Sequence, residues 1–150
     1  MTSRPTAGSR RRVMVAALAV VTVAAGLIVH RFVGGVLGDV AGDALYAVLI
    51  YLLAAFVLSR SPGLRPALIA VAFCTAVELL QVTGLPQAWA AAFPLSALVF
   101  GTGFDPRDIV VYALAAAAAA VTDVLLVRRC RPASASAHAT GRPPEGERPV

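Results

Sequence analysis

The sequence predicts an all-α, polytopic membrane protein built as a four-helix transmembrane bundle. Of the 150 residues, 59% are hydrophobic and only 14% are charged, whereas a soluble domain carries about 25% charged residues. Four apolar runs are long enough to cross a bilayer as helices. The chain has 13 arginines and no lysine. The arginines flank the apolar runs, as topology signals do.

The first predicted span covers residues 13–30. It follows a polar segment, residues 1–12, which we expect to be a disordered cytoplasmic tail. A cleaved signal peptide is the main alternative, because Arg10–Arg12 form a charged leader and Ala24–Gly26 offer small residues for cleavage. Three more apolar segments follow, so an uncleaved signal anchor is the simpler interpretation.

The second and third predicted spans cover residues 42–58 and 66–82. Residues 32–43 carry several glycines and two acids, which indicates a loop or an interfacial turn before the second span. Ser61-Pro62-Gly63 is a strong turn signal after it. Pro66 stands at a position that favours a helix start.

The last predicted span covers residues 108–127. Before it, residues 85–100 are apolar but interrupted by two prolines, and we interpret them as a short re-entrant or interfacial segment anchored by Trp89. Arginines stop the last span. We therefore expect one transmembrane domain over residues 13–131, followed by a disordered cytoplasmic tail over residues 132–150.

The arginines also predict the orientation. With four spans, eleven arginines fall on the side of the termini, and only Arg31 and Arg107 fall on the other side. The positive-inside rule then places both termini in the cytoplasm. Counting residues 85–100 as a fifth span would move the last arginine cluster outside, so the rule argues against a fifth span.

Several classes of site lack support in the sequence. Cys74 and Cys130 form no disulfide or zinc pattern, and His30 and His138 have no partners at metal-ligand spacing. Gly101-x-Gly103 has neither the preceding strand nor the following Gly-Lys-Ser of a phosphate loop. The arginines do not gather into a nucleic-acid patch. We expect no metal, no cofactor, no catalytic residue and no nucleic-acid partner, and hence no enzyme.

Polar residues at the outer ends of three spans are the candidate binding site. A charge inside a bilayer costs about 2.5–3.5 kcal/mol at a helix centre, so such residues usually face the bundle or a wet cavity. The four-span topology brings their helix ends to one side of the membrane. The candidates are Asp43, Glu78, Gln81, Asp108 and Tyr112.

A purely structural interpretation stays open for each candidate. Glu78 shares one helix face with Cys74 and Gln81, and a hydrogen bond to Tyr112 would let it simply fix the packing. Asp43 and Asp108 stand where an acid interacts favourably with a helix N-terminus. Asp123, near the cytoplasmic end of the last span, is expected to be structural and within reach of Arg128.

Three segments in order resemble a small bacterial membrane family, catalogued as domain-of-unknown-function family 2809. They are Gly42–Ala47, Glu78–Gln81 and Phe100–Tyr112. A more distant resemblance is to VanZ-like membrane proteins, which are associated with low-level glycopeptide-antibiotic resistance. That resemblance rests on Glu78, Gln81 and Asp108 and departs at Tyr112, where the VanZ-like pattern has asparagine. Both resemblances imply a multi-pass protein of the bacterial inner membrane, and neither implies an activity.

Three functions remain in order of preference. The first is a non-enzymatic protein whose outer-face cluster binds a small ligand or a lipid head group. The second is a structural or accessory subunit of a membrane complex. The third is an intramembrane enzyme that uses Glu78 and Asp108 as an acid–base pair. Membrane lipids, a small ligand or another membrane protein are the expected partners.

Overall fold

The computed structural model describes residues 7–59, 61–101 and 103–129. This part of the chain consists of helices joined by short turns, and it contains no strand. The elements are α1 (Ala7–Phe32), α2 (Gly35–Val57), α3 (Leu64–Gln81), α4 (Leu85–Ala92), η1 (Pro94–Ser96), α5 (Ala97–Phe100) and α6 (Pro106–Arg129). The predicted all-α class is confirmed.

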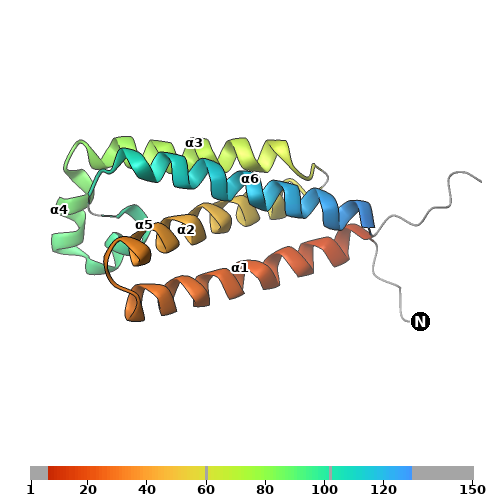
Figure 1. Cartoon of the computed structure of the whole chain (residues 1–150), viewed down its shortest axis with the longest axis horizontal. Coiled ribbons are helices and arrows are strands. Elements are labelled where there is room, and N and C mark those ends of the chain that lie inside the picture. The colour runs from red at the N-terminus through yellow and green to blue at the C-terminus, as the bar shows by residue number, and fades with distance from the viewer. Residues whose placement is uncertain (1–6, 60, 102, 130–150) are drawn as a thin grey trace, which may run out of the picture.

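Helices α1, α2, α3 and α6 are each long and apolar enough to cross a membrane. They alternate in direction, so α1 begins and α6 ends at the same end of the bundle (Figure 1). The chain is therefore a multi-pass membrane protein. We call the end that holds the start of α1 the basic end, and the end that holds α4 and α5 the acidic end.

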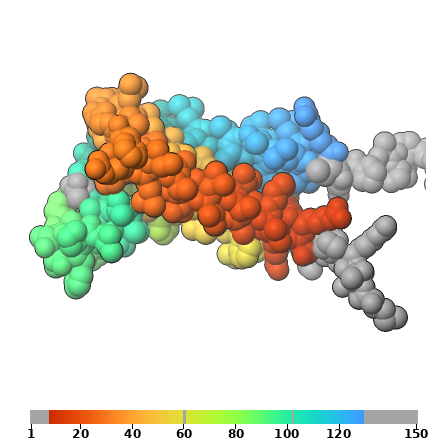
Figure 2. All heavy atoms as spheres, turned by 90° about the horizontal axis from the view of Figure 1, so that it is seen from below, coloured from red at the N-terminus to blue at the C-terminus, as the bar shows by residue number. Residues whose placement is uncertain are grey.

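Alanines let three of the four long helices pack closely. Helices α2, α3 and α6 pack closely against one another, whereas the close backbone approach of α1 is to α2 and α1 reaches α6 only through side chains. Ala47, Ala55, Ala70 and Ala116 are fully buried at these contacts. Small residues allow helix backbones to approach within a membrane, where no hydrophobic force drives association. Figure 2 shows α1 lying along the outside of the molecule.

The segment between the third and fourth spans folds into α4, η1 and α5 at the end of the bundle where α3 ends and α6 begins (Figure 1). Two contacts hold it in place. The Trp89 and Phe100 rings meet edge-to-face with their centroids 5.3 Å apart. The Gln81 side chain donates a hydrogen bond to the Phe100 carbonyl, with 2.7 Å between nitrogen and oxygen.

The helices start earlier than the sequence predicts. Residues 7–12, expected to be disordered, form the first turns of α1, and α2 begins at Gly35 rather than near residue 42. The glycines that indicated a loop in fact serve a tight turn between α1 and α2. A Cβ on Gly38 would lie 2.3 Å from the Val33 carbonyl oxygen, so only glycine allows this approach. The rest of the predicted N-terminal tail, residues 1–6, and the whole predicted C-terminal tail, residues 132–150, lie outside the described residues.

Arg11 joins three helices at the basic end. Its guanidinium forms an ion pair with Asp123 of α6, 2.6 Å away, and donates to the Ser59 carbonyl just beyond α2 at 2.8 Å. The Tyr51 hydroxyl of α2 donates to the same Asp123 oxygen at 2.9 Å. The sequence-based pairing of Asp123 with Arg128 is wrong, because the packing of α1 on α2 brings Arg11 closer to that carboxylate.

We predict that Asp123→Leu lowers the free energy of unfolding by about 3 kcal/mol, because it leaves the part-buried Arg11 guanidinium without its counter-charge. The double variant Arg11→Met/Asp123→Leu should regain most of that loss, since it removes both charges together. Thermal unfolding in detergent can be followed with a thiol-reactive dye that reports the exposure of buried Cys74, in a Cys130→Ser background.

Arg128→Met is the matched control. Its side chain is exposed, and the variant should unfold like the parent protein. A loss with Arg128→Met equal to that with Asp123→Leu would contradict the assignment of Arg11 as the partner.

Candidate functional site

The acidic end brings together polar side chains from three long helices. The Tyr112 hydroxyl of α6 donates to Glu78 Oε1 of α3 across 2.7 Å. The same hydroxyl lies 3.4 Å from Asp43 Oδ1 of α2, a longer and weaker contact. Tyr112 therefore stands at the meeting point of α2, α3 and α6, with a carboxyl group on either side of its oxygen.

Glu78 is the most deeply buried acid in the described chain, with 1% of its surface exposed. Helical spacing explains this position: Cys74, Glu78 and Gln81 occupy one face of α3, and all three are buried. Its second oxygen, Oε2, accepts a hydrogen bond from the Asp105 backbone N–H at 3.4 Å. A buried carboxyl group needs such partners, because water cannot supply them.

Asp108 completes the group of carboxyls. It lies in the first turn of α6, one helical turn before Tyr112, and its carboxyl is close enough to Asp43 and Glu78 to interact with their charges. Both aspartates are half-buried, whereas Glu78 lies beneath the surface. We call Asp43, Glu78, Asp108 and Tyr112 the acidic cluster; its carboxyls run from the half-buried rim inward to Glu78.

In the described part of the chain, no arginine contacts the acidic cluster directly. Arg107 interacts with Asp108 only at longer range, because its guanidinium is bonded to Asp105. The Arg107 hydrogen bonds hold the pKa of the exposed Asp105 carboxyl below its usual range. Arg31 lies over the Phe32 ring instead, 5.6 Å from its centroid. The cluster therefore carries more acid than base.

Gln81 is the one predicted site residue that turns elsewhere. Its amide nitrogen bonds to the Phe100 carbonyl and so fastens α5 to the end of α3. Gly101 follows with φ of +64°, and a Cβ there would lie 2.5 Å from that nitrogen. The structure thus brings together Asp43, Glu78, Asp108 and Tyr112 and places Gln81 beside them as a support for the α4–α5 segment.

The available chemistry is hydrogen bonding and the attraction of positive charge. Three carboxyls and one phenol surround a single point, and no described group of histidine, cysteine or acidic side chains is placed to hold a metal ion. Sequence reasoning missed the Asp105 backbone N–H, which only the turn before α6 aims at Glu78. It also missed the Arg11–Tyr51–Asp123 group, although a tyrosine inside an apolar run was a usable signal.

We predict that Tyr112→Phe lowers the free energy of unfolding by about 1–3 kcal/mol, because buried Glu78 loses its nearest hydrogen-bond donor. Tyr46→Phe is the matched control. The Tyr46 hydroxyl is buried next to the same helices but has no hydrogen-bond partner among the described residues, so its removal should leave stability unchanged. Equal losses in the two variants, measured by the Cys74 dye assay, would show that the Tyr112–Glu78 bond contributes nothing specific.

Comparison with known proteins identifies the family. The family model described as protein of unknown function (DUF2809) matches residues 32–116. That range is more than half of the chain and contains α2, α3, the α4–α5 segment, the start of α6 and the whole acidic cluster. No curated protein and no solved structure matches the chain, and the VanZ-like resemblance stays a prediction. The chain belongs to the DUF2809 family.

Proposed function

We propose that the acidic cluster binds the primary ammonium group of a small ligand or of a lipid head group. The observation that carries this proposal is the surplus of acid around the Tyr112 hydroxyl. Asp43, Glu78 and Asp108 approach one another, and no described cation contacts them directly. A charged amine would supply both the missing positive charge and up to three hydrogen-bond donors.

The position of the cluster suits a group that enters from the membrane surface. Asp43 lies in the third turn of α2 and Asp108 in the first turn of α6, and both are half-buried. Asp39, one turn before Asp43 on α2, is exposed and adds negative charge at the entrance. An ammonium group would meet these aspartates first, with Glu78 behind them. A lipid head group and a free amine share this chemistry.

Charge also supports a definite orientation. Described arginines other than Arg31 and Arg107 lie at the basic end, namely Arg10, Arg11, Arg12, Arg65, Arg128 and Arg129. Cytoplasmic segments of membrane proteins carry such an excess of arginine. We therefore place the protein in the bacterial inner membrane with both termini in the cytoplasm and the acidic cluster at the outer face.

A structural role for the cluster is the second candidate function. Glu78 already accepts hydrogen bonds from Tyr112 and from the Asp105 backbone, which favours a polar contact that fixes α3 against α6. In that case the protein would act as an accessory subunit of a membrane complex, and the cluster would contribute stability without binding a ligand.

Reporter fusions test the orientation. A fusion after residue 135 and one within residues 60–63, between α2 and α3, should both report the cytoplasm, and one at residues 33–34, between α1 and α2, should report the exterior. These sites lie outside the candidate spans. A C-terminal fusion that reports the exterior would contradict the proposed placement of the basic end.

Native mass spectrometry of the purified full chain tests the ligand class. With phosphatidylethanolamine and phosphatidylglycerol as probes, we expect a preference for the amine lipid that Asp43→Asn and Asp108→Asn each weaken about tenfold, as loss of a charged hydrogen bond implies. Asp39→Asn removes one charge at the same end but lies outside the cluster, and it should leave the preference intact.

The same measurement separates the two candidate functions and the two ligand sources. Competition by free ethanolamine would identify a small amine as a sufficient ligand, whereas binding of the lipid alone would identify the head group in its membrane setting. Absence of any preference for the amine lipid, together with a loss of stability in both variants, would reject ligand binding and favour the accessory role.

A further inference from the structure

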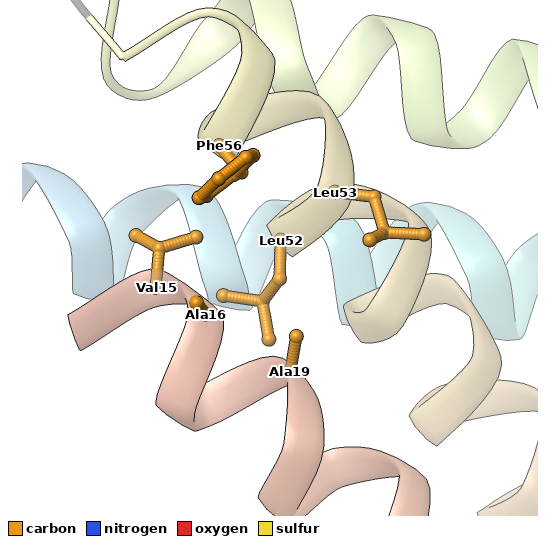
Figure 3. Close-up of a pocket in the computed structure, with 6 residues that line it drawn as sticks. All are labelled: Val15, Ala16, Ala19, Leu52, Leu53 and Phe56. Carbon is orange, nitrogen blue, oxygen red and sulfur yellow. The ribbon is translucent and has the colours of Figure 1, made fainter. Parts of the chain in front are cut away.

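An apolar groove follows the contact between α1 and α2, far from the acidic cluster. Its first part has a volume of about 230 Å³ and is lined by Val15, Ala16 and Ala19 of α1 and by Leu52, Leu53 and Phe56 of α2 (Figure 3). A second part of about 470 Å³ continues toward the acidic end. The two parts share Ala19 and Leu53, so they form one continuous groove along the surface of the bundle.

The groove exists because α1 packs closely against α2 alone. Its backbone approaches only that helix and reaches α6 through side chains, and small side chains of α1 leave space beside the contact with α2. Ala16, Ala19 and Ala24 supply much of the α1 wall. In a bilayer, a channel lined entirely by apolar side chains is filled by something equally apolar, because water gains no hydrogen bonds there.

Arg12 stands at the basic end of this groove. It precedes Ala16 by four residues, so the two side chains occupy the same face of α1, one turn apart. Arg10 is two residues earlier and therefore points to the opposite side of the helix. Side chains on a helix lean toward its N-terminus, which aims the Arg12 guanidinium out of the apolar channel and toward the membrane surface.

The Arg12 charge is not compensated within the described part of the chain. Asp123 is the one acid at the basic end among the described residues, and it is bonded to Arg11. Arg12 is exposed, and no described residue forms an ion pair or hydrogen bond with it. An apolar groove that ends at an unpaired arginine matches a molecule with an apolar chain and an anionic group.

We propose that the α1–α2 groove binds an anionic phospholipid of the leaflet at the basic end, with an acyl chain along the groove and the phosphate at Arg12. The dimensions agree. Twelve residues separate Arg12 from Ala24, which is about 18 Å along a helix, and one leaflet of the hydrocarbon core is about 15 Å thick. Arginine recognises phosphate well, and each basic side chain near a membrane surface attracts anionic lipid.

Phosphatidylglycerol and phosphatidylcholine, added to the delipidated full chain in detergent, are suitable probes for native mass spectrometry. We expect the first phosphatidylglycerol to bind more tightly than phosphatidylcholine. Arg12→Gln should weaken phosphatidylglycerol binding about fivefold, as the loss of one charge at a membrane surface implies. Arg10→Gln is the matched control, because it removes the same charge from the same helix end on the other side.

A second pair of variants tests the acyl chain. Ala16→Leu fills the first part of the groove and should weaken the binding of phosphatidylglycerol without changing the charge. Ala117→Leu makes the same substitution at an exposed position of α6, away from the groove, and should leave binding unchanged. Each variant is first shown to unfold like the parent protein in the Cys74 dye assay.

Three results would overturn the proposal. Equal losses in Arg12→Gln and Arg10→Gln would mean general charge attraction without a defined phosphate site. Unchanged binding in Ala16→Leu would mean that no chain occupies the groove. A dimer of the parent chain that Ala16→Leu abolishes would assign the groove to a second copy of the protein.

Discussion

Hydrocarbon offers no hydrogen bonds, so a polar side chain inside a bilayer must find its partner within the protein. The whole bundle is arranged around this constraint. Its middle is apolar, with fully buried alanines of α2, α3 and α6 in contact. Its interhelical polar contacts lie toward the two ends. At the acidic end, Tyr112 holds Glu78; at the basic end, Arg11 holds Asp123. Each contact joins helices that are distant in sequence.

The two polar groups differ in their balance of charge, and that difference separates structure from candidate function. At the basic end, one guanidinium meets one carboxylate, and Tyr51 and two backbone carbonyls add further hydrogen bonds. The charges of this pair balance, although the buried Arg11 Nε has no hydrogen-bond partner among the described residues. At the acidic end, Glu78 and Asp43 share one phenol and Glu78 also accepts from one backbone N–H; Asp108 adds a third carboxyl nearby, and the Arg107 guanidinium is engaged by Asp105. Carboxyl groups without a counter-ion at a membrane surface are a candidate site for a ligand that carries positive charge.

Composition and the spacing of apolar residues were enough to predict the fold class, the four spans and the short segment between the last two. Helical spacing also predicted that Glu78 faces inward, because one face of α3 carries Cys74, Glu78 and Gln81. Partners that depend on the packing of whole helices were beyond the sequence. Nothing local links Arg11 to Asp123, and only the lateral position of α1 decides that pairing. Likewise, the position of α5 determines that the Gln81 side chain bonds to the Phe100 carbonyl instead of joining the acidic cluster. Glycines at the start of α2 were misleading, because the same residue type serves loops and close helix contacts.

The distance in sequence between bonded partners has a consequence for the making of the protein. Glu78 and Tyr112 are 34 residues apart, and ribosomes add roughly 5–20 residues per second. Glu78 is therefore synthesised about 2–7 s before the phenol that donates to its carboxyl. The interval between the synthesis of Arg11 and that of its partner is longer still, since Asp123 follows Arg11 by 112 residues. Until α6 emerges, both polar side chains depend on water, lipid head groups or the insertion machinery. The last helix thus completes both ends of the bundle in a single step.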